Sequence, residues 1–251
     1  MDTGPGGGWC WGDMMIRVID YETTGTNEDA NAEIIECGSY DLAQSDSGAW
    51  HLVRPVHWLV RPSRPIPPEA RAVHHISDAD VADAPLLREI VDDFLDGADV
   101  CAAHNARFEQ HFTPYKGLRW ICTYKCARVV WPDAPGHSNQ CLRYWLGLDD
   151  AADFDAGRSM PPHRALPDAY VTAHLLRVLL AKKTVEQLIE ISKWPALLKV
   201  MNFGKHKGMA FADAPADYLE WIRDKSDMNE DTKFSAKYWL QKRRAAGPNN
   251  P

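Results

Sequence analysis

The order of strand-like and helical segments in this chain restricts its fold more than any other feature of the sequence. Three strand-like segments follow one another near the N-terminus: MIRVIDYE, AEIIECGSYDLA and WHLVRPVHWLVRP. Beyond them, helical segments alternate with short apolar strands such as DVCAAHN and the beginning of RWICTYKCARVVWP. We therefore expect an α/β domain built on a mixed β-sheet flanked by helices. The prolines of the third segment predict an edge strand or a bent hairpin arm.

Changes in composition along the 251 residues predict five segments. A Gly-rich leader (1–13) is expected to be flexible and to precede the α/β domain (14–183). The clearest predicted helix, LPDAYVTAHLLRVLLAKK, closes that domain, and a linker helix (184–194) follows it. A small basic α+β module (195–244) comes next, before a tail (245–251) that is expected to be disordered.

The sequence predicts neither a membrane protein nor a metal site built from cysteines. It has no apolar run near the ~20 residues that span a bilayer, and its first residues lack the basic and apolar regions of a secretory signal. Its six cysteines lie in apolar contexts, without the second close Cys or His pair that would favour zinc. We expect reduced thiols in a cytoplasmic protein.

Charge is unevenly distributed along the chain. Residues 1–181 hold 15 Lys and Arg against 26 Asp and Glu, whereas residues 182–251 hold 13 against 9. An acidic body joined to a basic C-terminal segment is expected if that segment helps to hold a polyanion. Taken alone, the asymmetry is equally consistent with a solvated, Lys-rich face.

Two acids lie two residues apart at the end of the first strand-like segment, in VIDYETTG. Side chains at i and i+2 of a strand point to the same face, so Asp20 and Glu22 project together. Close carboxylates repel each other unless a cation lies between them, and such oxygen ligands suit Mg²⁺ or Mn²⁺. Taken alone, the pair is more typical of a surface strand end with two solvated acids.

Two later stretches each place an acid in the first turn of a predicted helix. In CAAHNARFEQHF, Glu109 follows a strand that ends at Asn105, and in PPHRALPDAY, Asp168 follows the loop residue His163. The helix dipole by itself explains an acid at such a position, and a lone loop histidine is most often a surface residue. Histidine is also the usual proton acceptor from water near neutral pH.

Together, the three motifs resemble those of the DnaQ-like (DEDDh) 3′–5′ exonuclease superfamily. IDYETTG is similar to the first motif of that family, AHNARFE to the second and HRALPDA to the third, in the same order along roughly residues 15–181. The resemblance implies a ribonuclease H-like fold and the hydrolysis of phosphodiester bonds at the 3′ ends of nucleic acids.

The resemblance also implies a role for each catalytic residue. Asp20, Glu22 and Asp168 would hold a first divalent cation, Asp20 would be shared with a second, and Glu109 would hold the second mostly through water. His163 would take the proton from the attacking water. Two cations about 4 Å apart stabilise both the attacking and the leaving oxygen of such a reaction. Two ions of Mg²⁺ or Mn²⁺ are therefore the expected cofactors.

Glu109 departs from the family pattern, because the second motif usually ends in aspartate. Its extra methylene is expected to move the acid towards direct metal contact or to shift the metal preference, without obviously abolishing activity. A second resemblance concerns MNFGKHKGMAFADAPADYLEWI, which is similar to a short module that follows the nuclease domain in some exonuclease X-like proteins. Its turn presents Lys205 and Lys207, which are suited to contacting backbone phosphates.

Five residues are candidates for binding the terminal nucleotide. Thr23, Thr24 and Thr26 are expected to hold the 3′-hydroxyl and sugar, and Asn105 is a further candidate. The stretch VHHI resembles a VHGI loop of the family, which would place His74 near the terminal nucleotide. A structural role for His74 is at least as strongly expected.

The expected function is metal-dependent 3′–5′ exonuclease activity that releases nucleoside monophosphates from single-stranded or frayed DNA 3′ ends, as DNA repair requires. The alternative is a 3′–5′ exoribonuclease on single-stranded RNA, since the catalytic motifs do not separate the two sugars. A non-catalytic nucleic-acid-binding module is less favoured, because four of the five catalytic residues match the family. The expected partners are single-stranded DNA or RNA 3′ ends and no membrane.

Overall fold

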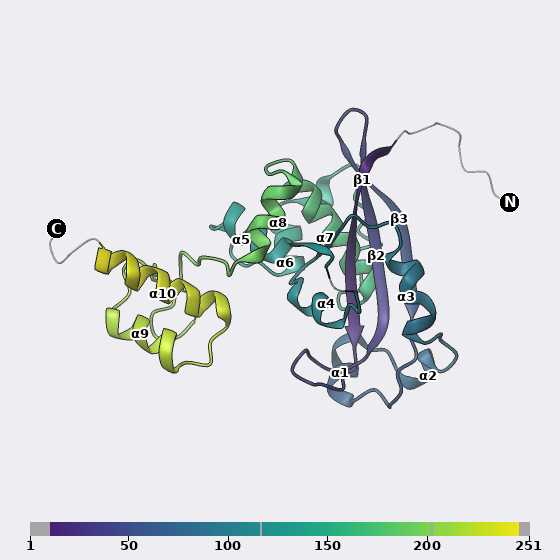
Figure 1. Ribbon diagram of the computed structural model, residues 1–251, viewed down its shortest axis with the longest axis horizontal. Helices are drawn as coiled ribbons and strands as arrows, with labels where there is room; N and C mark the ends of the chain where they lie inside the picture. The colour runs from purple at the N-terminus through teal and green to yellow at the C-terminus, as the bar shows by residue number, and fades with distance from the viewer. Residues whose placement is uncertain (1–10, 116, 202, 246–251) are drawn as a thin grey trace.

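The structure is a computed structural model that describes residues 11–115, 117–201 and 203–245 (Figure 1). Residues 1–10 of the predicted leader and 246–251 of the predicted tail lie outside the described residues. Strand β1 (Trp11–Thr23) begins inside the predicted leader, because the backbone of Trp11 pairs with Ser45 of β2 (Ile34–Ser45). No helix in the described ranges is long and apolar enough to cross a membrane.

A five-stranded mixed sheet forms the centre of the larger unit, in the order β3-β2-β1-β4-β5. β1, β2 and β3 (Trp50–Leu59) are antiparallel neighbours, whereas β4 (Val100–Ala103) and β5 (Arg119–Cys122) run parallel to β1. The mixed sheet predicted from the order of the segments is confirmed. β3 lies at one edge, as its prolines predicted.

Helices cover both faces of this sheet (Figure 1). One face packs against α5 (Thr123–Val130), α6 (Asn139–Trp145), α7 (Ala165–Leu180) and the 3₁₀ turn Leu148–Asp150. The other face packs against α3 (Leu87–Leu95). The short helices α1 (Pro68–His74) and α4 (Arg107–Phe112) lie near the end of β1, and α2 (Asp78–Val81) follows α1.

The predicted linker helix belongs to the core of the larger unit. It is observed as α8 (Val185–Lys193), and it contacts β5 and α5. Val185 and Leu188 are buried in the same cluster as the residues beneath α7. The apolar face of this helix is therefore covered by the edge of the sheet.

The C-terminal module has a hydrophobic core of its own, which includes Met201, Phe211 and Leu219. Its helices α9 (Ala216–Lys225) and α10 (Glu230–Ala245) pack against each other, and an isolated bridge pairs Val200 with Ala210. Figure 1 shows the module set apart from the sheet and joined to it by the segment after α8. α10 reaches into the predicted tail by one residue, Ala245.

Candidate active site

Three carboxylates from two distant segments meet at the end of β1. Ile16 and Val18 point into the core beneath α7, and the same alternation directs Asp20 and Glu22 to that face. Asp168, in the first turn of α7, completes the group. One carboxylate oxygen from each of the three acids lies within 4.8 Å of the other two. The structure thus brings together the acids of the first and third motifs.

Glu109 lies beside this group of three. Because β4 is parallel to β1, the helix that follows β4 begins at the same end of the sheet, and its first turn carries Glu109. The side chain is buried, and its Oε2 has no hydrogen-bond partner among the described residues. A buried carboxylate oxygen without a partner is costly, so this atom is suited to a ligand such as a metal-bound water.

Burial and mutual repulsion raise the pKa of all four acids. Burial is the largest cause for Asp20, and the charges of Asp168 and Glu22 raise its pKa further. Burial and then Asp168 raise the pKa of Glu22 to about 8, and burial with the charge of Glu22 raises that of Glu109 to about 8. Burial also raises the pKa of Asp168. A divalent cation would relieve this repulsion, and carboxylate oxygens suit hard cations, so the residues fit such an ion.

His163 lies at the mouth of the acidic group. It adopts the left-handed conformation, with φ of 59°, and its backbone N–H donates a hydrogen bond of 2.7 Å to Oδ2 of Asp168. The side chain is exposed and lines the hollows on both sides of the acids. The backbone at His163 is therefore tied directly to one of the three acids, while the imidazole faces solvent.

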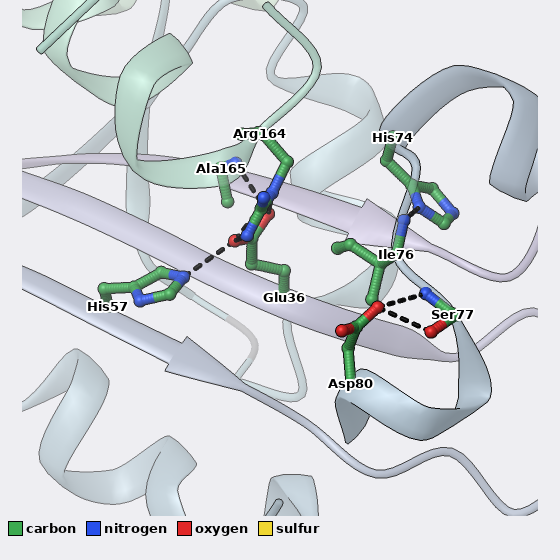
Figure 2. Close-up of polar contacts among 8 residues, drawn as sticks. All are labelled: Glu36, His57, His74, Ile76, Ser77, Asp80, Arg164 and Ala165. Carbon is green, nitrogen blue, oxygen red and sulfur yellow. Dashed lines mark hydrogen bonds and ion pairs between the residues drawn. The ribbon is translucent and has the colours of Figure 1, made fainter. Parts of the chain in front are cut away.

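An ion pair between Arg164, directly after His163, and the buried carboxylate of Glu36 was not predicted from the sequence (Figure 2). The carboxylate of Glu36 on β2 accepts hydrogen bonds from Nε and Nη2 of Arg164, at 2.6–3.1 Å, and from the backbone N–H of Ala165, at 2.9 Å. Nε2 of His57 lies 2.7 Å from the same carboxylate. Although burial alone would raise the pKa of Glu36, the bonds from His57, Arg164 and Ala165 lower it to about 2.

This ion pair fixes the start of α7 on β2. Arg164 joins the loop of His163 to the helix that carries Asp168, so its position sets the position of both. Gly38 allows the close approach, because a Cβ at that residue would lie 2.2 Å from the carbonyl carbon of Ala165. The signal in the sequence was an acid, Glu36, directly after the apolar residues Ile34 and Ile35 of β2.

A hollow of about 440 Å³, here called the terminal hollow, opens beside the acids. Thr23, the last residue of β1, and Thr26, from the loop that follows, line it. Oγ1 of Thr23 donates a hydrogen bond of 2.5 Å to the carbonyl of Gly25. Thr24 does not line the hollow: its side chain is buried, and its Oγ1 accepts a hydrogen bond of 2.9 Å from the backbone N–H of Glu33. Thr24 therefore holds the loop in place.

His74 and Asn105 form further parts of the wall of the terminal hollow. Nδ1 of His74 accepts a hydrogen bond of 3.0 Å from the backbone N–H of Ile76 (Figure 2), whereas its buried Nε2 has no partner within the described ranges. Burial lowers the pKa of His74 and so favours its neutral form. Both roles weighed for His74 are thus compatible with its position, since one ring nitrogen supports the backbone.

Comparison with known sequences shows the family of this chain. The family model described as "Exonuclease" matches residues 18–176. Exodeoxyribonuclease 10 of Escherichia coli (strain K12) is 35% identical over 233 residues, which cover 90% of this chain and 99% of that protein. DNA polymerase III subunit epsilon of Haemophilus influenzae is 32% identical over 187 residues, which cover 66% of this chain and 68% of that protein.

Solved structures agree with this result. Exonuclease X in complex with 5′ overhanging duplex DNA is 36% identical, with a TM-score of 0.59, and the match covers 70% of this chain and 99% of that one. The nuclease domain of 3′hExo, a DEDDh family member bound to rAMP, is 18% identical with a TM-score of 0.52, which supports the fold alone. The predicted ribonuclease H-like fold is confirmed. The chain belongs to the exonuclease family and is a divalent-metal-dependent 3′–5′ exonuclease of the DnaQ-like type, as its three motifs predicted.

Proposed function

We propose that this exonuclease releases nucleoside monophosphates from single-stranded or frayed DNA 3′ ends, using two Mg²⁺ or Mn²⁺ ions. The observation that carries the proposal is the buried group of Asp20, Glu22 and Asp168, whose carboxylates lie within 4.8 Å of one another beside Glu109. This concentration of negative charge is unfavourable without cations and would hold them against a phosphodiester. A non-catalytic binding module is disfavoured, since such a module needs no acids of this kind.

Each acid has a separate role in the proposal. Asp20, Glu22 and Asp168 would hold one cation, with Asp20 shared by a second that Glu109 supports. Bound divalent cations supply positive charge to the attacking and leaving oxygens. His163 accepts the proton of the attacking water, since its imidazole borders the acids on both sides. Its backbone bond to Asp168 holds this base at the metal site.

The terminal hollow would hold the last nucleoside of the strand. Thr23 would face the sugar from the end of β1, Thr26 from the loop that follows, and Asn105 from the loop before α4. The unpaired Nε2 of neutral His74 is suited to a hydrogen bond with the terminal nucleotide. Thr24 contributes indirectly, through the bond between its Oγ1 and Glu33.

DNA is the proposed substrate because the exodeoxyribonuclease and the exonuclease X that resemble this chain are named for or bound to DNA. Removal of 3′-terminal deoxynucleotides is a step that DNA repair requires, so we propose that process. Five cysteines of the described chain are free, four of them buried, which supports a reducing, cytoplasmic location.

The test uses DNA and RNA oligonucleotides of the same sequence, each labelled at the 5′ end. With Mg²⁺ or Mn²⁺, the wild-type protein should convert labelled DNA to a ladder of shortening products, and it should act more slowly on RNA. Added EDTA and the Asp20→Asn variant should each abolish the ladder. Loss of the label at the first turnover would contradict the 3′–5′ polarity. Faster degradation of RNA than of DNA would show that RNA is the preferred substrate.

A further inference from the structure

Two hollows meet at the metal-binding acids. The terminal hollow is lined by all four acids, and a larger hollow of about 700 Å³, here called the outer hollow, adjoins it and is lined by Asp168 alone of the four. The two share four lining residues: His104, Asn105, His163 and Asp168. Cleavage of the last phosphodiester bond requires one nucleotide on one side of the metal and the rest of the strand on the other. The two hollows provide these two places.

The distribution of charge shows which side takes the rest of the strand. Among the described residues, no Lys or Arg lines the terminal hollow, whereas Arg107 and Lys125 line the outer hollow beside Asp168, Glu230 and Asp231. A single nucleoside needs no further cations, but a longer strand carries one negative charge for each added phosphate. The strand that precedes the last nucleotide is therefore better accommodated in the outer hollow.

The outer hollow continues onto the C-terminal module. A third hollow of about 570 Å³, here called the module hollow, adjoins it at Arg107 and Glu230. The two residues form an exposed ion pair, 3.4 Å from Nη1 to Oε2, between α4 and α10. The module hollow is rich in cations, which are Arg107, Arg223, Lys233 and Lys237, and Glu230 is its one acid.

Within the described ranges, two of the four cations of the module hollow are paired with acids, Arg107 with Glu230 and Arg223 with Asp224, and its two lysines are not. Lys233 and Lys237 are one helical turn apart on α10 and face the same hollow, and neither has an ion-pair partner among the described residues. Such a pair repels, and an anion between or along the two lysines removes the repulsion. Phe234 lies half-buried between them and also lines the hollow, which offers an aromatic surface to an unstacked base.

We propose that the module hollow binds the phosphate backbone of the same single strand whose 3′ end occupies the active site. The strand leaves the acids through the outer hollow, passes Arg107, and lies along Lys233 and Lys237 with a base against Phe234. This inference rests on the proposed exonuclease function and extends it. The module then provides a second binding site for the substrate strand, and the enzyme is expected to prefer strands long enough to reach it.

The test compares the full-length wild-type protein with K233Q/K237Q and with K182Q/K183Q as a control of equal charge. Lys182 and Lys183 follow the C-terminal end of α7, while Asp168 lies in its first turn, so the control changes a surface about 20 Å or more from the acids. Binding of a labelled DNA strand of about 15 nucleotides is measured by anisotropy in EDTA over a series of salt concentrations. Circular dichroism verifies folding.

K233Q/K237Q should weaken binding several-fold. It should also reduce the magnitude of the negative slope of log K against log salt by about 1.4, or about 0.7 for each lost phosphate contact. Its kcat/KM on this strand should also fall relative to that on a trinucleotide. Glu230→Gln should tighten binding, because it removes the one acid of the module hollow. Equal slopes and affinities for K233Q/K237Q and the control would overturn the inference, even where the wild-type protein degrades DNA. Failure of the wild-type protein to degrade any strand would instead refute the proposed function.

Discussion

Replacing Glu36 by alanine should lower the free energy of unfolding by about 3–5 kcal/mol, the usual cost of removing one partner from a buried ion pair. The side chain of Glu36 is 1% exposed, and that of Arg164 is 34% exposed. The change leaves the guanidinium of Arg164 and the N–H of Ala165 without their acceptor. Removal of Arg164 should cost a similar amount, because it leaves the buried carboxylate with too few donors.

The pH dependence of stability gives an independent magnitude for the same interaction. The pKa of Glu36 falls from 4.5 to about 2, since its hydrogen bonds from His57, Arg164 and Ala165 outweigh the effect of burial. A pKa shift of this size corresponds to about 3 kcal/mol of stabilisation of the folded state. Because the pKa is lowered in the folded state, this stabilisation is complete above about pH 4.5 and is lost as the pH falls towards 2.

The assay is urea denaturation followed by tryptophan fluorescence at pH 7.5 in EDTA, for wild-type, E36A, R164A and E36A/R164A. The double variant should be destabilised by about as much as either single variant, which corresponds to a coupling energy of about 3–5 kcal/mol, because no unpaired charge remains. The surface pair of Lys193 and Glu190, both more than half exposed, is the control, and K193A should lose less than about 1 kcal/mol. Additive losses, or a loss below about 1 kcal/mol in E36A, would refute the reasoning.

Four further outcomes are expected. Glu109→Asp should keep substantial activity, whereas Glu109→Ala should lose on the order of 100-fold in turnover. Near-wild-type rates for both variants would show that Glu109 is not part of the active site. His163→Ala should lower turnover by about 10²–10⁴-fold and leave the Mn²⁺ affinity unchanged by calorimetry, and a loss of affinity would contradict its role as a base. Asp20→Asn should raise the thermal midpoint of the metal-free protein, because burial and neighbouring charges raise the pKa of Asp20. The variant should also lose the upward shift of the midpoint that Mg²⁺ gives the wild-type protein. A lower midpoint of the metal-free variant would contradict this reasoning. Burial and the charge of Arg177 lower the pKa of His174 to about 4. Wild-type stability should therefore fall as the pH drops from 7.5 to 5, when the unfolded histidine takes up a proton, and His174→Gln should remove about 2 kcal/mol of this fall in urea titrations. An unchanged pH dependence in the variant would show that His174 does not carry it.

The parts of the fold that sequence predicted correctly depend on local signals. The hydrophobic period separates strands from helices, and the prolines in β3 mark an edge strand. For α8, the sequence shows an apolar helix face and does not show that β5 covers it. Likewise, continued strand alternation would place Thr24 on the face of Asp20 and Glu22, but β1 ends at Thr23 and Thr24 does not line the terminal hollow.

Acids in the three motifs were recognisable because each motif is short and the order of the motifs is distinctive. The ion pair of Glu36 and Arg164 was not, because its two residues stand far apart and neither belongs to a local pattern with the other. The same limit applies to Glu109: the sequence places it at the right end of the sheet, and only the fold shows an unpaired oxygen beside the other acids.

The separation of the metal-binding acids along the chain has a consequence for synthesis on the ribosome. Asp20 is made early, whereas Asp168 is made near the end of the region that matches the exonuclease family. Until α7 docks on β1 and β2, the three carboxylates do not meet within 4.8 Å. A chain released before that point lacks the complete group of three acids, so we expect unfinished copies to be inactive as exonucleases.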